Sequence, residues 1–126
     1  MEFGLSETQR MIQQTARDFA VKEVAPLADK VDKQEYFPQE NVRRMAELGF
    51  MGVTTPEEYG GSGLSNLCLS LIQMEINRGC ASTGVTMSVH NSLVQAPLLK
   101  YGTEAQKKDY LPKLAGGEWI GAYSLS

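Results

Sequence analysis

The feature of this sequence that most constrains its fold is the uncharged run between Arg78 and Lys100. It is the longest stretch of the chain without Asp, Glu, Lys or Arg. Its many polar residues make it unsuitable as a membrane span. Wound as a helix, the run places Val85, Val89 and Leu93 on one side and has no charged side. A helix without a charged side is normally surrounded by other elements, so we expect a central helix whose small side chains allow close approach.

Length, charge and composition favour one soluble domain. A chain of 126 residues can bury one modest core, and a hydrophobic content of 42% is ordinary for a globular protein. The net charge of -3 and the lack of a Lys/Arg cluster do not indicate a nucleic-acid partner. The N-terminus has no secretory-signal pattern. Cys68 and Cys80 lack metal or redox spacing, so we expect buried, reduced thiols in an intracellular protein.

Capping signals and prolines divide the first part of the chain into helices. Residues 6–9 form a capping box, and an amphipathic stripe follows it. Pro26 is expected to kink or end this helix and to begin a second one that reaches about Asp32. Pro38 opens a third helix, which Gly49 ends in a left-handed conformation.

The second part of the chain carries similar signals. Residues 50–63 are rich in glycine and predict an irregular connection, and no Lys-Ser/Thr follows that would make it a phosphate-binding loop. Ser65 caps a fourth helix that Gly79 ends. After the uncharged run, a second capping box at residues 103–106 opens a last helix, which Pro112 bends or ends. These signals predict an all-α bundle of about six helices.

Glu75 lies inside an apolar arc of the fourth helix, where a carboxylate is costly unless it is paired. One interpretation is a general base with a raised pKa. The other is a partly buried ion pair, either with Arg78 or with a residue of another helix. We favour the ion pair, because no other catalytic signature lies near Glu75 in the sequence.

His90 is the only histidine of the chain. A Ser-His-Asp arrangement would have to use it, but no nucleophile signature accompanies it. A zinc site would need more ligands than His90 and two separated cysteines provide. We therefore favour a hydrogen-bonded helix residue over a chemical role.

The character of the sequence changes at its end, where Ile120 to Ser126 is strand-like. A lone strand cannot pair its own backbone groups. We therefore expect the chain to be a fragment cut at a domain boundary, with the first strand of a β domain at its end.

Several stretches, in order and over essentially the whole chain, resemble the N-terminal helical domain of the acyl-CoA dehydrogenases. The motif around the uncharged run is most similar to the short-chain, butyryl-type branch. The stretches that carry the resemblance are residues 50–61, 79–85, 90–93, 101–107, 110–114 and 117–126.

The resemblance implies an FAD enzyme that introduces a trans-2,3 double bond into a fatty acyl-CoA thioester. A carboxylate removes the α-proton, the β-hydrogen leaves as hydride to the flavin, and electrons pass to an electron-transferring flavoprotein. It also implies a homotetramer, with residues 1–118 as the helical domain and 119–126 as the start of a middle β domain. The location would be cytoplasmic, or the mitochondrial matrix in a eukaryote.

The resemblance also assigns roles to individual residues. Thr86, Val89 and Leu93 match positions that line the acyl-chain pocket, although plain core packing is an equal alternative. Residues 123–126 match the start of the flavin-binding segment. They are Tyr123, Ser124, Leu125 and Ser126, the last of which keeps the hydroxyl of the family's usual threonine. No catalytic residue is assigned, because the family's catalytic glutamate lies in a C-terminal domain that these residues do not include. The match places Glu75 at a structural position.

Two alternatives to a dehydrogenase remain open at this point. An acyl-CoA oxidase-like flavoprotein would share the fold and react directly with oxygen. A helical binding or interaction module would have no catalysis at all. For the isolated chain we expect no dehydrogenase activity and weak affinity for FAD.

Overall fold

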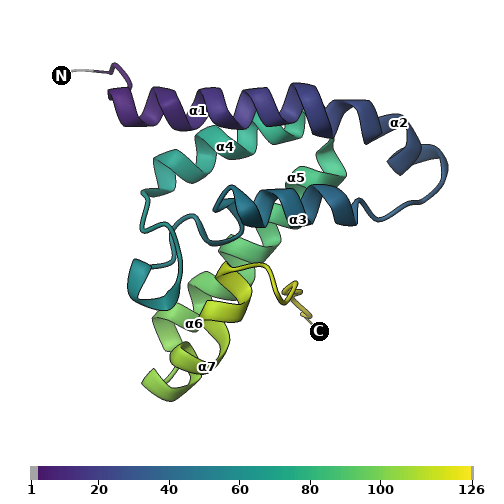
Figure 1. Cartoon of the computed structure of the whole chain (residues 1–126). Helices are drawn as coiled ribbons and strands as arrows, with labels where there is room; N and C mark the ends of the chain where they lie inside the picture. The colour runs from purple at the N-terminus through teal and green to yellow at the C-terminus, as the bar shows by residue number, and fades with distance from the viewer. Residues whose placement is uncertain (1–2, 126) are drawn as a thin grey trace.

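The structure is a computed structural model that describes residues 3–125, and within that range the regular elements are all helical, without a β-strand (Figure 1). The helical elements run into one another at two places and form five continuous rods in the described part. In chain order the elements are α1 (Glu7–Phe19), the π-helical turn η1 (Ala20–Val24), α2 (Ala25–Lys33), α3 (Gln39–Glu47), the 3-10 turns η2 (Phe50–Gly52) and η3 (Glu57–Tyr59), α4 (Asn66–Gly79), α5 (Ala81–Val89), the π-helical turn η4 (His90–Gln95), α6 (Ala96–Tyr101) and α7 (Glu104–Ala115). The all-α prediction is confirmed.

The helix starts follow the predicted caps. The Ser6 and Thr103 side chains each accept a hydrogen bond from the third residue of the helix, and both capping boxes are complete. Pro26 lies in the first turn of α2, as predicted, but it does not end the preceding helix. The wide turn η1 leads directly into α2, so the two helices form one rod. A π-helical turn changes the backbone hydrogen-bond spacing just before the proline, where the missing N–H would otherwise break the ladder.

The core lies where α1 runs alongside α4 and where α5 packs against α4 (Figure 1). Phe19 of α1 meets Phe50 edge to face, with ring centroids 6.3 Å apart. Burying such side chains supplies most of the favourable free energy of folding. Both thiols are buried and free, as predicted. The fully buried hydrophobic residues are Ala16, Val24, Met45, Met51, Val53, Ile72, Ile76, Met87 and Leu111.

The small residues of α5 allow α4 to approach closely, as the sequence indicated. A Cβ atom added at Gly84 would lie 2.3 Å from the Asn77 Oδ1 of α4. The Gln73 amide of α4 donates to the Gly84 carbonyl at 2.6 Å. The absence of a side chain at Gly84 therefore lets α4 hydrogen-bond directly to the backbone of α5.

The prediction that the uncharged helix is surrounded on all sides is wrong for the described residues. The rod formed by α5, η4 and α6 buries one side only, and Val85 and Leu93 on its other side are 56% and 44% exposed. The reason is that the buried side of η4 is polar, with His90, Asn91 and Gln95 at 0%, 1% and 1% exposure. Because these side chains of η4 lie inward and bind neighbouring backbone, Leu93 of the same turn points outward.

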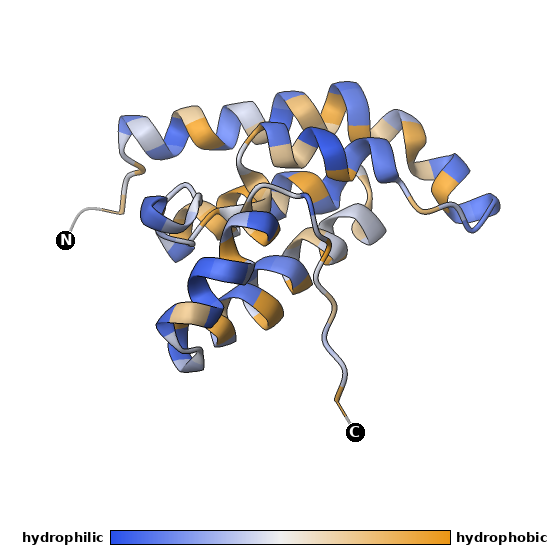
Figure 2. Cartoon of the chain, turned by 60° about the horizontal axis from the view of Figure 1, so that its bottom comes forward, coloured by the Kyte–Doolittle hydropathy of each residue, from blue (hydrophilic) through white to orange (hydrophobic). Residues whose placement is uncertain are grey.

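The chain leaves α7 through a turn and continues as a segment without regular structure, which extends away from the helices (Figure 2). No strand forms over Ile120–Leu125, because no partner strand in the described residues accepts its backbone hydrogen bonds. Ser126 lies outside the described residues. Within the same range, no helix has the length and apolar character to cross a bilayer.

Candidate functional site

The polar side of η4 holds the loop between α3 and α4 through Asn91. Its Oδ1 accepts from the Val53 backbone N–H at 2.9 Å. Its Nδ2 donates to the Phe50 carbonyl at 2.9 Å and to the Met87 carbonyl at 3.0 Å. The buried amide is thereby satisfied, and the loop acquires a fixed position on the rod.

Gln95, at the end of η4, binds the same loop at Met51 and Thr55. Its Nε2 donates to the Met51 carbonyl at 2.5 Å, and its Oε1 accepts from the Thr55 hydroxyl at 2.7 Å. The sequence alone predicts no role for Asn91 or Gln95. The available signal was their amide side chains within a run that has no charged side.

His90 is the third member of this polar side and is fully buried. Its Nε2 lies 2.8 Å from the Leu114 carbonyl oxygen, and its Nδ1 lies 2.9 Å from the Gly121 backbone nitrogen. A carbonyl only accepts and a backbone N–H only donates, so the proton sits on Nε2 and the ring is neutral. Burial lowers the pKa of His90. The interpretation of His90 as a hydrogen-bonded helix residue is confirmed.

The opposite side of the rod carries the residues predicted to line an acyl pocket. Thr86 and Val89 are half-buried and Leu93 is 44% exposed. The Thr86 hydroxyl donates to the Ser82 carbonyl at 2.9 Å, so it is occupied within its own helix. Since Leu93 is exposed, plain packing against the described residues does not account for it.

The residues predicted to begin a flavin-binding segment lie at the end of the described chain. Tyr123 and Leu125 are 53% and 81% exposed, and Ser124 is also exposed. Ser126, the fourth predicted residue, lies outside the described range. The segment starts against η4, because Gly121 touches Val94 and is hydrogen-bonded to His90. The predicted acyl-pocket residues therefore lie on the rod, and the predicted flavin-binding segment follows Gly121, which contacts the same rod. Within the described residues no hydrogen bond joins the two sets.

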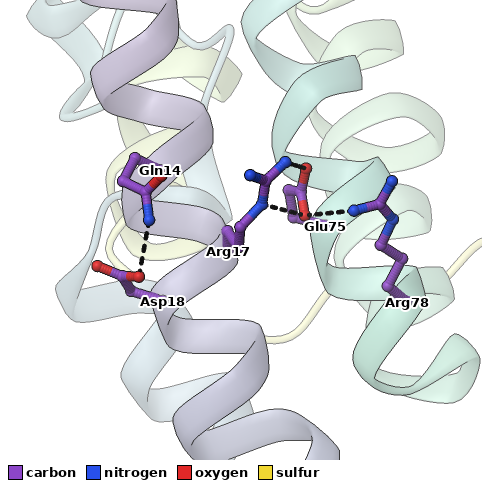
Figure 3. Close-up of polar contacts among 5 residues, drawn as sticks. All are labelled: Gln14, Arg17, Asp18, Glu75 and Arg78. Atoms are coloured by element: carbon purple, nitrogen blue, oxygen red, sulfur yellow. Dashed lines mark hydrogen bonds and ion pairs between the residues drawn. The ribbon is translucent and has the colours of Figure 1, made fainter.

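Glu75 shows the paired arrangement (Figure 3). Its carboxylate is 2% exposed and accepts from the Arg17 Nε and Nη2 of α1 at 3.2 and 3.0 Å. Arg78, one turn along α4, adds a contact at 3.4 Å. The hydrogen bonds from Arg17 are the main reason that the pKa of Glu75 is lowered. A general base needs a raised pKa, so that interpretation is wrong and the ion-pair interpretation is confirmed.

Fold and site together define an all-helical domain in which the rod of α5, η4 and α6 buries the polar side chains of His90, Asn91 and Gln95 and exposes Val85 and Leu93. The family model described as "Acyl-CoA dehydrogenase, N-terminal domain" matches residues 6–118. The chain is 50% identical over 122 residues to the mitochondrial short-chain specific acyl-CoA dehydrogenase of Bos taurus, covering 97% of this chain and 30% of that protein. It is 43% identical over 126 residues to the short-chain specific acyl-CoA dehydrogenase of Clostridium acetobutylicum, covering 100% of this chain and 33% of that protein.

A solved structure, the butyryl-CoA dehydrogenase of Megasphaera elsdenii, matches with a TM-score of 0.88 at 32% identity, over 95% of this chain and 32% of that chain. The chain therefore belongs to the acyl-CoA dehydrogenase family of oxidoreductases, and its helices form that family's N-terminal domain. It spans about a third or less of the length of these relatives, 30% for the bovine protein and 33% for the clostridial one.

Proposed function

We propose that this chain acts within an FAD-dependent acyl-CoA dehydrogenase that oxidises a short-chain acyl-CoA to its trans-2-enoyl thioester. Its own part is to provide one wall of the acyl pocket, from Thr86, Val89 and Leu93, and to begin the flavin-binding segment at Tyr123. The relatives named for short-chain acyl-CoA and butyryl-CoA dehydrogenation support this substrate class.

The observation that carries the proposal is the outward side of the rod. Val85 and Leu93 are exposed to 56% and 44%, and no charged residue lies between Arg78 and Lys100. An exposed helix of a soluble domain ordinarily presents charged side chains to water. An uncharged apolar side is suited to a ligand of the same character, and the hydrocarbon of an acyl thioester has that character.

The terminal segment fits a flavin by its hydrogen-bonding groups. Between Ala122 and Leu125 the backbone makes no hydrogen bond to other described residues, and the Ser124 side chain is exposed. These groups are therefore available to bind a polar ring edge. When bound, FAD supplies the hydride acceptor, while Tyr123, Ser124, Leu125 and Ser126 bind and orient it.

The remaining parts of the proposal concern the whole subunit. Glu75 is committed to Arg17, so it does not serve as the base that removes the α-proton. That base is the glutamate that the family carries in its C-terminal domain. An electron-transferring flavoprotein takes the electrons, and the subunits form a homotetramer. The location is cytoplasmic, or the mitochondrial matrix in a eukaryote, and the bovine relative is named as a mitochondrial protein.

The test uses the complete gene product that contains these residues. We expect it to purify with bound FAD, and anaerobic butyryl-CoA to bleach the absorbance of the oxidised flavin. A colourless protein, or a flavin that butyryl-CoA does not bleach, would contradict the proposal. Hydrogen peroxide formed in proportion to turnover in air would instead identify an oxidase.

A further inference from the structure

The segment that follows α7 is guided back to the rod through a series of close contacts. Gly117 adopts a φ of 73°, and a Cβ there would lie 2.4 Å from the Ala46 Cβ of α3. The Trp119 N–H then donates to the Lys113 carbonyl at 3.1 Å. The Lys113 ammonium lies 4.3 Å from the centroid of the Trp119 ring. The path of the chain is therefore set as far as Trp119.

The last of these contacts is with η4, at Gly121. A Cβ at Gly121 would lie 2.6 Å from the Val94 Cγ1, so a side chain at this position would force Val94 to shift. The Gly121 N–H donates to the His90 Nδ1 at 2.9 Å. In the described residues after Gly121, no further hydrogen bond to the helices is formed. His90 is thus the final point that fixes the segment before Tyr123.

His90 joins three parts of the structure through one ring. Its backbone belongs to the rod, where Val89 is the preceding residue and Leu93 follows three residues on. Its Nε2–H donates to the end of α7 at the Leu114 carbonyl, and its Nδ1 accepts from the terminal segment. Burial keeps water from competing for either bond, and it also makes an unsatisfied ring nitrogen costly.

We propose that His90 is a positioning residue, which sets where the flavin-binding segment starts relative to the acyl wall formed by Val89 and Leu93. This inference rests on the proposed function, because it assigns that segment to flavin and that wall to the acyl chain. His90 acts through Gly121 and touches neither group itself. It acts as the neutral ring protonated on Nε2, the form in which it can make both bonds.

Two substitutions separate the two bonds of the ring. In His90→Asn the amide oxygen reaches the place of Nδ1, so the bond from Gly121 is kept and the bond to Leu114 is lost. In His90→Gln the amide nitrogen reaches the place of Nε2, so the bond to Leu114 is kept and the bond from Gly121 is lost. Each variant loses one hydrogen bond to a backbone group, which makes them matched controls for stability.

The first measurement is amide hydrogen exchange at Gly121 in the 126-residue chain. We expect exchange about fivefold faster in His90→Gln than in His90→Asn, the factor that corresponds to one ordinary hydrogen bond. In the unsubstituted chain, the imidazole nitrogen shifts should show Nδ1 unprotonated, which needs no variant to fold. A protonated Nδ1, or equal exchange in the two variants, would overturn the inference.

The second measurement is the dissociation constant for FAD of the complete gene product. We expect His90→Gln to bind FAD about fivefold more weakly than His90→Asn, because its binding segment is no longer held at its start. Equal affinities in the two variants would overturn this inference and leave the proposed function intact. A wild-type protein that does not bind FAD would overturn both.

Discussion

The Arg17 guanidinium of α1 grips the Glu75 carboxylate of α4 with both Nε and Nη2, at 3.2 and 3.0 Å from its two oxygens. The carboxylate is 2% exposed, whereas the Arg17 side chain is 44% exposed. This two-point contact fixes the pairing of α1 with α4. Because the Glu75 carboxylate is bound in this pair, we expect it to contribute to stability and not to catalysis.

Glu75→Gln should therefore lower the free energy of unfolding at neutral pH by about 2 kcal/mol, because Arg17 and Arg78 lose their negative partner. The pKa of Glu75 is lowered in the folded state, so its contribution is present above the unfolded pKa of about 4.3 and is lost as the pH falls through the folded value. Chemical denaturation over acid pH should show the wild type and the variant converging. The control is Glu47→Gln, which removes a surface pair with Arg44 and should change stability little. Curves that stay parallel to low pH would contradict this account.

Asn91→Leu should destabilise the domain by about 3 kcal/mol, because it leaves the Val53 N–H and the Phe50 carbonyl buried without partners. Ser92→Ala is the matched control, since Ser92 is the next residue, is exposed and bonds only to the Ser88 carbonyl of its own helix. Urea denaturation of both variants measures the difference. A loss in Asn91→Leu no larger than that in Ser92→Ala would show that Asn91 does not hold the loop.

His90 should titrate below its ordinary pKa, because burial disfavours the charged ring. Its contribution to stability is present above the unfolded pKa of about 6.5 and declines as the pH falls below that value, where the unfolded chain binds the proton first. The chain has a single histidine, so one imidazole signal reports the titration without assignment. An imidazole pKa at or above 6.5 in the folded chain would contradict the buried, neutral ring.

Local signals in the sequence were sufficient to predict where helices begin. Ser6 and Thr103 bond to the third residue of their own helices, so their capping boxes are readable from neighbouring letters. The sequence predicts that Glu75 must be paired, because it lies in an apolar arc. Its main partner Arg17 is 58 residues away, and only the packing of α1 on α4 identifies it.

The inward side of η4 was not predictable in the same way. Asn91 and Gln95 bind backbone atoms that are 38 to 44 residues away, and backbone groups leave no signal in side-chain patterns. The π-helical turn adds a second difficulty, because a periodicity of about 100° per residue assumes an α-helix throughout. Val85 and Leu93 still lie on one side of the rod despite the π-helical turn. That side is exposed, so the expectation of a fully surrounded helix is wrong.

If the outward side of the rod contacts the acyl chain, a substitution at Leu93 should change the preference of the enzyme for acyl-chain length. In the complete gene product, Leu93→Phe should narrow the pocket, so the kcat/KM ratio of hexanoyl-CoA to butyryl-CoA should fall about tenfold. Leu67→Phe is the control, because Leu67 of α4 is 48% exposed, close to the 44% of Leu93. We expect an unchanged ratio for Leu67→Phe. A ratio in Leu93→Phe equal to that of the wild type would contradict the claim.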